Sequence, residues 1–284
     1  MQYIFMRFPQ GKSKALTFSY DDGVLSDKKL RAVFDEHNLK CTFNINSGQF
    51  ISEEEKAKST DPTRRMTIPE ALETYNNSDH ELAIHGINHS FMEQLPLSTA
   101  VYEGLNDRLN LEKTFGRVVR GMAYPFGTWS DALIEGLKSS GVAYSRTTYA
   151  TNSFDIPEDW LKLNPTCHHN DEQLFDLAEK FINENPGEAW CNGKPWLFYV
   201  WGHSYEFVKQ DNWDRIEKFA DMVSNKDDIW YATNIEIYDY VQAYRNLAFS
   251  VDASMVTNNS AFEIWFEQDG QTKSVKPGET KKLF

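Results

Sequence analysis

Four groups of residues in this sequence carry side chains or turns that could take part in chemistry. The first is Asp21-Asp22-Gly23, in which two adjacent carboxylates follow an apolar run that starts at Ala15. Adjacent carboxylates repel each other, so a fold keeps them together where a positive charge compensates them or where the side chains diverge. A bound divalent cation is one such charge, and a solvated turn is the competing interpretation.

The second group is His85 and His89, which follow the apolar run at residues 81–84. Two imidazoles four residues apart can share one face of a helical turn and converge on one metal ion. Ser90 and Glu93 have the spacing of a capping box, which predicts that a helix begins beside the second histidine. The spacing alone also leaves open two unrelated loop histidines.

The other two groups also follow apolar runs. In residues 124–127, Tyr-Pro-Phe-Gly, the proline and the glycine restrict the backbone, which can aim an amide N–H at a substrate oxygen. His203 comes shortly after the aromatic run at residues 196–201. Taken singly, the first is a turn and the second a structural histidine, but all four groups fall where a predicted strand ends.

Short apolar runs and amphipathic stretches alternate along most of the chain. Strands are predicted at residues 15–20, 41–45, 82–84, 121–124, 142–146, 196–201 and 229–232, and helices at 25–37, 67–75, 98–115, 129–140, 171–183, 212–224 and 235–244. This alternation predicts parallel strands covered by helices. Seven or eight repeats favour a closed or nearly closed β/α barrel over an open sheet, and in such a barrel chemistry takes place at the carboxyl ends of the strands.

The character of the sequence changes after about residue 246. Short β-like runs occur at 248–251, 262–267 and 273–275, and Asp269-Gly270 is a hairpin signal. We therefore expect a barrel domain over residues 1–246 and a small β appendage over 247–284. The appendage is too short to fold alone and should pack on the barrel. A dimer contact there, and hence a homo-oligomer, stays open.

The composition restricts the class of protein. The 284 residues carry a net charge of −13 and no basic run, which argues against nucleic acid or an anionic membrane surface as a partner. The longest apolar run is too short to span a bilayer. Cys41, Cys167 and Cys191 are far apart and odd in number, which favours reduced thiols. Because the N-terminus lacks a signal-peptide pattern, we expect a soluble cytoplasmic protein.

In this order and context, the Asp-Asp-Gly and His-x-x-x-His motifs resemble those of the polysaccharide deacetylase family, the fourth family of carbohydrate esterases. The resemblance covers residues 15–244. It implies a distorted β/α barrel and one divalent metal ion, often zinc, although an Asp and two His also suit cobalt, nickel or manganese. Carried over by position, the metal ligands are Asp22, His85 and His89.

The resemblance also implies catalytic roles. Asp21 is expected to be the general base, His203 the general acid, and the backbone N–H of Phe126 an oxyanion donor. The family usually places an Arg just before its Pro-Tyr-Gly turn, where the Arg braces the catalytic Asp, but this chain has Ala123 there. Arg146, at the end of the following strand, is the candidate replacement.

Further residues are assigned to substrate binding, as neighbours of these groups or as rings that could stack on a sugar. They are Tyr124, Phe126, Arg146, His168 and Trp201. The adjacent pair His168-His169 departs from the best-known members of the family, and a hydrated loop is the alternative to a place in the pocket. Other aromatic residues that could stack on a sugar ring, or pack in the core, are Trp129, Tyr149, Trp160 and Tyr205.

The leading hypothesis is metal-dependent hydrolysis of a carbon–nitrogen bond, namely removal of the N-acetyl group from an amino sugar or its oligomer. A cytoplasmic location favours a small-molecule or oligosaccharide substrate over cell-wall polymer. Hydrolysis of another small amide, such as a ureide or a formamide, would suit the same barrel and metal. A non-catalytic, metal-bearing carbohydrate-binding protein is the third hypothesis, and the presence of Asp21 and His203 argues against it.

Overall fold

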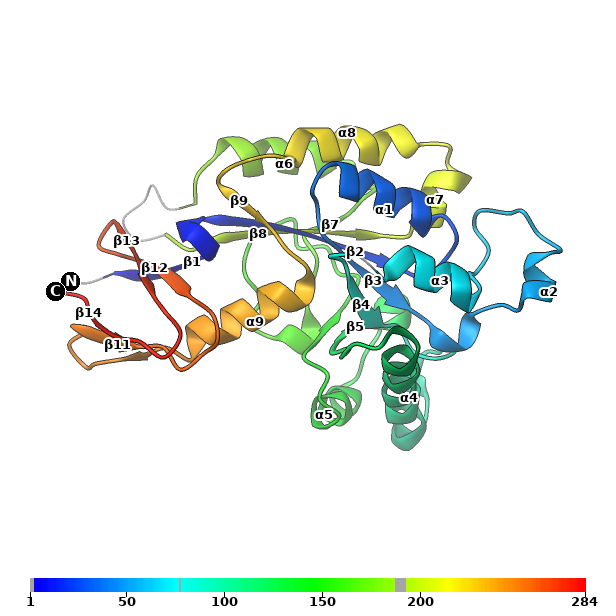
Figure 1. Ribbon diagram of the computed structural model, residues 1–284, viewed down its shortest axis with the longest axis horizontal. Helices are drawn as coiled ribbons and strands as arrows, with labels where there is room; N and C mark the ends of the chain where they lie inside the picture. Colours follow the sequence, from blue (N-terminus) through cyan, green and yellow to red (C-terminus); the bar gives the residue numbers. More distant parts are fainter. Residues whose placement is uncertain (1–2, 77, 187–192) are drawn as a thin grey trace.

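The central feature of the computed structural model, which describes residues 3–76, 78–186 and 193–284, is a curled sheet of eight parallel strands (Figure 1). The predicted distorted β/α barrel is therefore confirmed. Its strands are β2 (Lys14–Asp21), β3 (Cys41–Ile45), β4 (Glu81–Ile84), β5 (Gly121–Ala123), β6 (Tyr144–Arg146), β7 (Cys167–His168), β8 (Trp196–Gly202) and β9 (Ile229–Tyr231).

The strand order is β6-β5-β4-β3-β2-β8-β7, and β9 pairs with the first residues of β2. The segment that contains β7 closes the ring, because Leu163 pairs with Arg146 of β6 while Cys167 pairs with Val200 of β8. Closure brings the carboxyl ends of β2, β4, β6 and β8 to one opening, where side chains from distant parts of the chain can meet.

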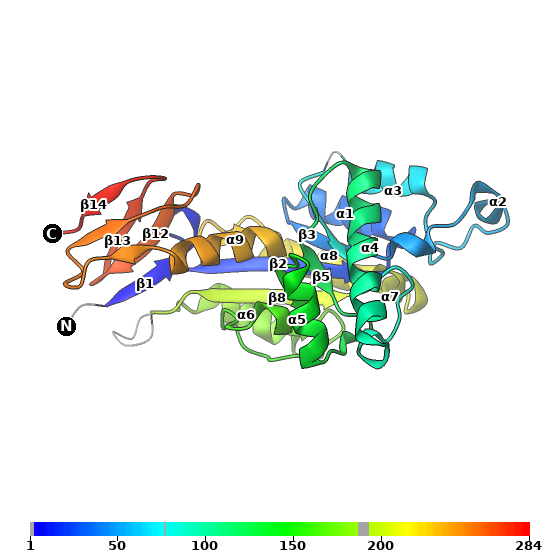
Figure 2. The same cartoon turned by 90° about the horizontal axis from the view of Figure 1, so that it is seen from below.

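Helices cover the outside of the barrel, with α6 and α8 along one side and α4, α5 and α9 along the other (Figures 1 and 2). The α-helices are α1 (Asp27–Glu36), α2 (Glu53–Lys56), α3 (Ile68–Tyr75), α4 (Leu97–Phe115), α5 (Asp131–Ser139), α6 (Leu174–Asn183), α7 (Ser204–Lys209), α8 (Trp213–Val223) and α9 (Asn234–Arg245). Short 3-10 turns are η1 (Pro9–Gly11), η2 (Ser47–Gln49), η3 (Met92–Gln94), η4 (Pro125–Gly127) and η5 (Trp160–Lys162).

Of two predicted capping boxes, one is present in the structure and the other is not. Thr67 and Glu70 form a capping box that opens α3. The capping box predicted at Ser90 and Glu93 is wrong, because only the 3-10 turn η3 follows His89 and its N-cap makes no side-chain bond. The carboxylate of Glu93 instead accepts a hydrogen bond from Thr128 Oγ1 at 2.7 Å.

A β unit lies at one end of the barrel, beside both chain termini (Figure 2). It contains β10 (Ala248–Phe249), β11 (Met255–Thr257), β12 (Ile264–Gln268), β13 (Gln271–Val275) and β14 (Thr280–Lys282). The N-terminal strand β1 (Ile4–Arg7), which the sequence did not predict, pairs antiparallel with β12. One apolar core, which includes Phe8, Tyr240 and Phe266, continues from the barrel into this unit.

The cysteines and the helices bear on the predicted class of protein. Cys41 and Cys167 are buried free thiols, and Cys191 lies outside the described residues. In the described parts of the chain, no helix combines the length and the apolar character that crossing a membrane requires.

Candidate metal centre

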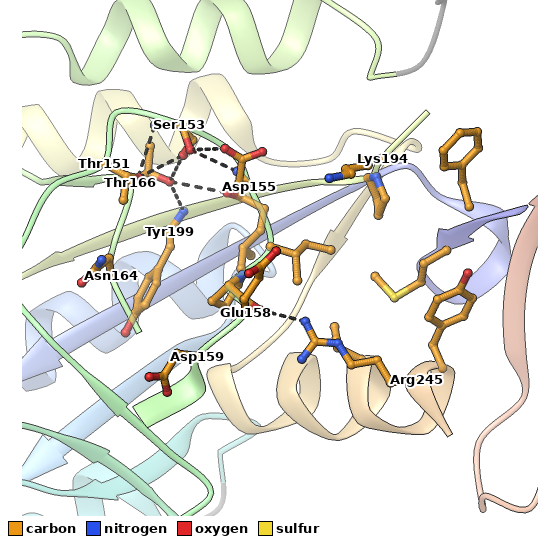
Figure 3. A pocket seen from close by; sticks show the side chains of 18 of the residues that line it. Thr151, Ser153, Asp155, Glu158, Asp159, Asn164, Thr166, Lys194, Tyr199 and Arg245 are labelled. Carbon is orange, nitrogen blue, oxygen red and sulfur yellow. Dashed lines mark hydrogen bonds between the residues drawn. The ribbon is translucent and has the colours of Figure 1, made fainter. Parts of the chain in front are cut away.

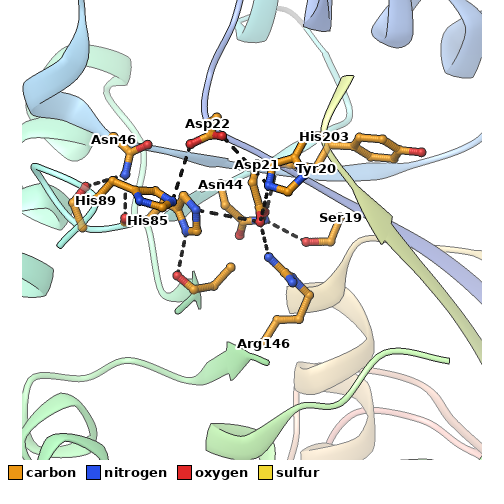
Figure 4. Close-up of polar contacts among 12 residues, drawn as sticks. Ser19, Tyr20, Asp21, Asp22, Asn44, Asn46, His85, His89, Arg146 and His203 are labelled. Carbon is orange, nitrogen blue, oxygen red and sulfur yellow. Dashed lines mark hydrogen bonds and ion pairs between the residues drawn. The ribbon is translucent and has the colours of Figure 1, made fainter. Parts of the chain in front are cut away.

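The two carboxylates at the end of β2 have different partners (Figure 4). Asp21 is 2% exposed; its Oδ1 accepts a hydrogen bond from Asn44 Nδ2 at 2.8 Å, and its Oδ2 accepts one from Arg146 Nη2. Asp22 leaves the strand with a φ of 88°, which is uncommon for a residue other than glycine. Its Oδ1 accepts a hydrogen bond from Arg65 Nη2 at 3.0 Å.

His85 follows β4 and presents a free nitrogen to these carboxylates. Its Nδ1 lies 2.8 Å from the carbonyl oxygen of Ala123. Because a carbonyl oxygen only accepts, we assign the proton to Nδ1 and the lone pair to Nε2. Nε2 is buried, has no hydrogen-bond partner, and lies 3.8 Å from Asp21 Oδ2. A metal ion would satisfy this nitrogen, so the residues fit a metal site.

His89 reaches the same place through a turn rather than on a helix face, which corrects the expectation from spacing. Gly86 and His89 have φ values of 73° and 55°, and Asn46 Nδ2 donates to the carbonyl oxygens of His85 and Gly86. His89 Nε2 lies 3.7 Å from Asp22 Oδ1. The ligand atoms of Asp22, His85 and His89 all lie within 4.8 Å of one another (Figure 4).

Two carboxylates on α4 hold this turn in place. Asp107 Oδ2 accepts from the backbone N–H of His85 at 2.9 Å, and its Oδ1 accepts from that of Ser47 at 2.7 Å. Glu103 accepts from the backbone N–H and the Nδ2 of Asn88, at 3.0 and 2.7 Å. Because both carboxylates are buried, these bonds fix the histidine turn against the long helix.

Burial and neighbouring charges together set the protonation of the centre. Burial alone would raise the pKa values of Asp21 and Asp22. Arg146 beside the first, and the protonated form of His85 together with Arg65 beside the second, outweigh this effect and lower both pKa values. Burial lowers the pKa of His85 to about 4. The carboxylates are therefore ionised and His85 is neutral at pH 7, as metal ligation requires.

Arg146 lies where it can brace Asp21. Its side chain is 0% exposed, its Nη2 donates to Asp21 Oδ2, and its guanidinium carbon lies 4.3 Å from the ring centroid of Trp201. Arg146 therefore lies on Asp21, where a replacement for the family's usual Arg was expected. A guanidinium with no exposed surface holds the carboxylate rather than meeting a substrate.

A second group of potential ligands lies beside His203. His203 Nε2 is 3.9 Å from Asp21 Oδ2, while its Nδ1 is 3.5 Å from Glu206 Oε1. The Nε2 atoms of His168 and His169 lie 3.1 and 3.0 Å from Glu206 Oε2. His168, His169 and Glu206 therefore also meet the distance criterion for a metal site.

The tautomer of His168 distinguishes this second group from the first. The backbone N–H of Asn170 donates to His168 Nδ1 at 3.1 Å, so neutral His168 carries its proton on Nε2 and donates to Glu206. Glu206 therefore gathers imidazole N–H groups, which lower its pKa although burial would raise it. Burial would lower the pKa of His203, but the Glu206 contact and the Asp21 and Asp22 charges raise it.

Of the remaining predicted residues, Phe126 lies beside the centre and Tyr124 lies in the core. Tyr124 is buried, and its hydroxyl donates to the carbonyl oxygen of Leu161 at 2.9 Å, so its side chain does not face the opening. Phe126 has a φ of 59° and is 47% exposed. Its ring stacks on Phe91 with 3.6 Å between centroids, and it meets His89 edge-on at 4.5 Å.

Sequence reasoning missed Asn44, Asn46, Arg65 and Asp107. The two asparagines carry a signal that could have found them, since they are polar residues at the carboxyl end of the predicted strand 41–45. Arg65 and Asp107 belong to a loop and to a helix, where no motif marks them.

A separate cleft of about 940 Å³ lies among β1, β8, α9 and the segment from Thr151 to Thr166 (Figure 3). Its lining includes charged residues such as Asp155, Lys162 and Arg245. None of the residues predicted for catalysis, metal binding or substrate binding lines it. The candidate metal centre thus lies outside this cleft, at the carboxyl ends of the strands.

Comparisons with known proteins agree with this fold. Residues 9–145 match the family model for polysaccharide deacetylases, the family that the motifs of this chain resemble. No match was found among curated protein sequences.

Two solved structures share this fold at low identity. A candidate polysaccharide deacetylase from Mycobacterium smegmatis aligns with a TM-score of 0.56 and 16% identity, over 84% of this chain and 93% of its own. The Xyl-CE4 domain of a multidomain xylanase from the hindgut metagenome of Trinervitermes trinervoides aligns with a TM-score of 0.51 and 11% identity, over 81% of this chain and 92% of its own. The deacetylase PplD of Streptococcus pyogenes, in complex with acetate, aligns with a TM-score of 0.42 and 18% identity. This chain spans 61% of the length of that protein.

Proposed function

We propose that this protein is a metal-dependent hydrolase that removes the N-acetyl group from an amino sugar or its oligosaccharide. The observation that carries the proposal is the convergence of Asp22, His85 and His89 beside the ionised Asp21, in a chain that matches the family model for polysaccharide deacetylases. The free Nε2 lone pair of His85 supports metal ligation over a structural role for this histidine.

Asp22, His85 and His89 would hold one divalent ion. Bound there, the ion supplies Lewis-acid polarisation of a water molecule and of the acetyl carbonyl oxygen. One carboxylate and two imidazoles leave coordination positions for water and substrate, as catalytic sites require. Zinc suits this donor set, and so do cobalt, nickel and manganese.

The protein residues around the ligands would move the protons. Asp21, held ionised by Arg146 and Asn44, would take a proton from the attacking water. The N–H of Phe126 would donate to the oxyanion that forms on the acetyl carbon. His203 would then donate a proton to the departing nitrogen, so that the carbon–nitrogen bond breaks and acetate and a free amine remain.

The test is acetate release from N-acetylglucosamine oligomers by protein that has been stripped of metal and reloaded with zinc or cobalt. Release should require the metal, and Asp21→Asn should slow it by about 100-fold or more while metal binding persists. Asp131→Asn removes a carboxylate that is 88% exposed and should leave the rate unchanged. Metal binding without acetate release would contradict the N-acetyl sugar as substrate and favour another amide.

A further inference from the structure

Arg65 lies on the oxygen of Asp22 that faces the predicted metal ligands. Its Nη2 donates to Asp22 Oδ1 at 3.0 Å, and its Nη1 donates to Asn46 Oδ1 at 3.3 Å. His89 Nε2 lies 3.7 Å from the same Asp22 oxygen. One carboxylate oxygen therefore faces both the guanidinium and the place where a metal ion would bind.

The backbone keeps Arg65 beside Asp22 in the folded chain. Arg65 forms an antiparallel bridge with Val24, and the flanking N–H of Leu25 donates to the carbonyl oxygen of Arg64 at 2.9 Å. The Arg65 side chain is 24% exposed, whereas the Arg146 side chain is fully buried. Arg65 can therefore exchange its ion pair for water at a small cost, because its guanidinium is already partly hydrated.

The two adjacent carboxylates thus have one arginine each. Arg146 compensates Asp21, and Arg65 compensates Asp22. A divalent ion on Asp22 would share an oxygen with a guanidinium of like charge, so each cation should weaken the binding of the other. We propose that Arg65 is a built-in counter-cation of Asp22, which competes with the metal ion and lowers the affinity of the centre for it.

This inference rests on the metal site of the proposed function but not on the substrate. Its test is a titration of stripped protein with Zn²⁺ or Co²⁺ against a chromogenic chelator, without substrate. Arg65→Gln removes the charge and should raise metal affinity by about tenfold or more. Arg65→Lys keeps the charge and should stay within about threefold of the wild type.

Arg64→Gln is the matched control, because it makes the same charge change in the same loop. Arg64 forms a two-pronged ion pair with Glu70, at 2.9 and 2.7 Å, and has no contact with Asp22 among the described interactions. The metal affinity of Arg64→Gln should differ from that of the wild type by less than about threefold. An equal gain in Arg64→Gln would overturn the proposal in favour of a general charge effect.

Thermal unfolding gives a second readout. Without metal, Arg65→Gln should unfold at a lower temperature than the wild type, because Asp22 loses its counter-charge. Added metal should raise the unfolding midpoint of Arg65→Gln by more than it raises that of the wild type. Unchanged or weaker metal binding in Arg65→Gln would overturn the proposal and make Arg65 a residue that positions Asp22. A wild type that binds metal but releases no acetate would contradict the proposed substrate and leave this inference standing.

Discussion

At the residue scale, the centre is built from residues in unfavourable conformations. Asp22, His89 and Phe126 are not glycines, yet their φ values are 88°, 55° and 59°. Left-handed conformations of such residues cost free energy and persist where the surrounding structure determines them, which occurs frequently at functional sites. In the centre these residues are two proposed metal ligands and the proposed oxyanion donor, whereas the other non-glycine residues with positive φ lie elsewhere in the described chain.

The pair of Asp21 and Arg146 should matter for stability as well as for catalysis. Their side chains are 3% and 0% exposed, so Arg146→Met would leave a buried carboxylate without its charged partner. The free energy of unfolding, measured with urea, should fall by about 3–5 kcal/mol. The double variant with Asp21→Asn removes both charges and should recover most of this loss. Equal losses in the single and double variants would argue against the pairing.

The sequence predicted the residues of the centre unequally. Asp22, His85 and His89 stood in motifs whose order and spacing were informative, and the structure brings them together. Arg146 was identifiable as a replacement for the family's Arg because it ends the neighbouring strand. Arg65 was not predictable in the same way, since only the folded loop brings it to Asp22.

At the element scale, the strands were predictable wherever a buried run was long enough to show a pattern. β7 has two residues and β1 pairs with a strand more than 250 positions later, so neither carries a local signal. The turn after β4 was predicted as helical, but Gly86 and His89 take left-handed conformations there. Turns of this kind depend on partners such as Asn46, which the local sequence does not specify.

A pH effect on stability should come from β4. The buried carboxylate of Glu81 accepts hydrogen bonds from Thr42, Tyr144 and the backbone N–H of Ile235, at 2.8, 2.7 and 2.9 Å. Burial raises the pKa of Glu81 to about 7. Because this pKa exceeds that of the unfolded chain, near 4.3, the stabilisation is full below about pH 4 and is lost as the pH rises through about 7.

Glu81→Gln should therefore reduce the loss of stability between pH 5 and pH 8. The difference from the wild type, measured by urea unfolding at both pH values, should be on the order of 1–3 kcal/mol. Burial also raises the pKa values of Asp27 and Asp107 to about 7, so the free energy of unfolding of the variant should still fall in part as the pH rises. If the free energy of unfolding changed with pH equally in the variant and the wild type, Glu81 would be ionised in the folded protein over this pH range.

At the scale of the whole molecule, both ends of the chain meet in the β unit. β1 adds to β12, and the core of this unit includes Phe8 from the N-terminal segment and Tyr240 from α9. The β structure after residue 246 was predictable from its short runs and its hairpin signal. The contribution of the N-terminus was not, because strand pairing across the length of the chain leaves no local pattern. The boundary at residue 246 stays a prediction.

At this scale, the residues that the structure describes include two groups of histidines and a carboxylate that meet the distance criterion for a metal ion. In the first, the bond from His85 Nδ1 to a carbonyl oxygen leaves Nε2 free. In the second, the bond from the Asn170 N–H to His168 Nδ1 puts the proton on Nε2, which faces Glu206. The His168 tautomer makes the first group the better candidate for a metal ion, although both ring nitrogens of His169 in the second group are also buried without a hydrogen-bond partner.

The most direct test of this account is elemental analysis of the purified chain after loading with zinc and removal of free metal. The wild type and His168→Ala should each retain about one ion per chain, while His85→Ala should retain essentially none. His168→Ala is the matched control because it removes an imidazole from the second group only. Metal retained by His85→Ala, or lost from His168→Ala, would contradict the assignment of the centre to Asp22, His85 and His89.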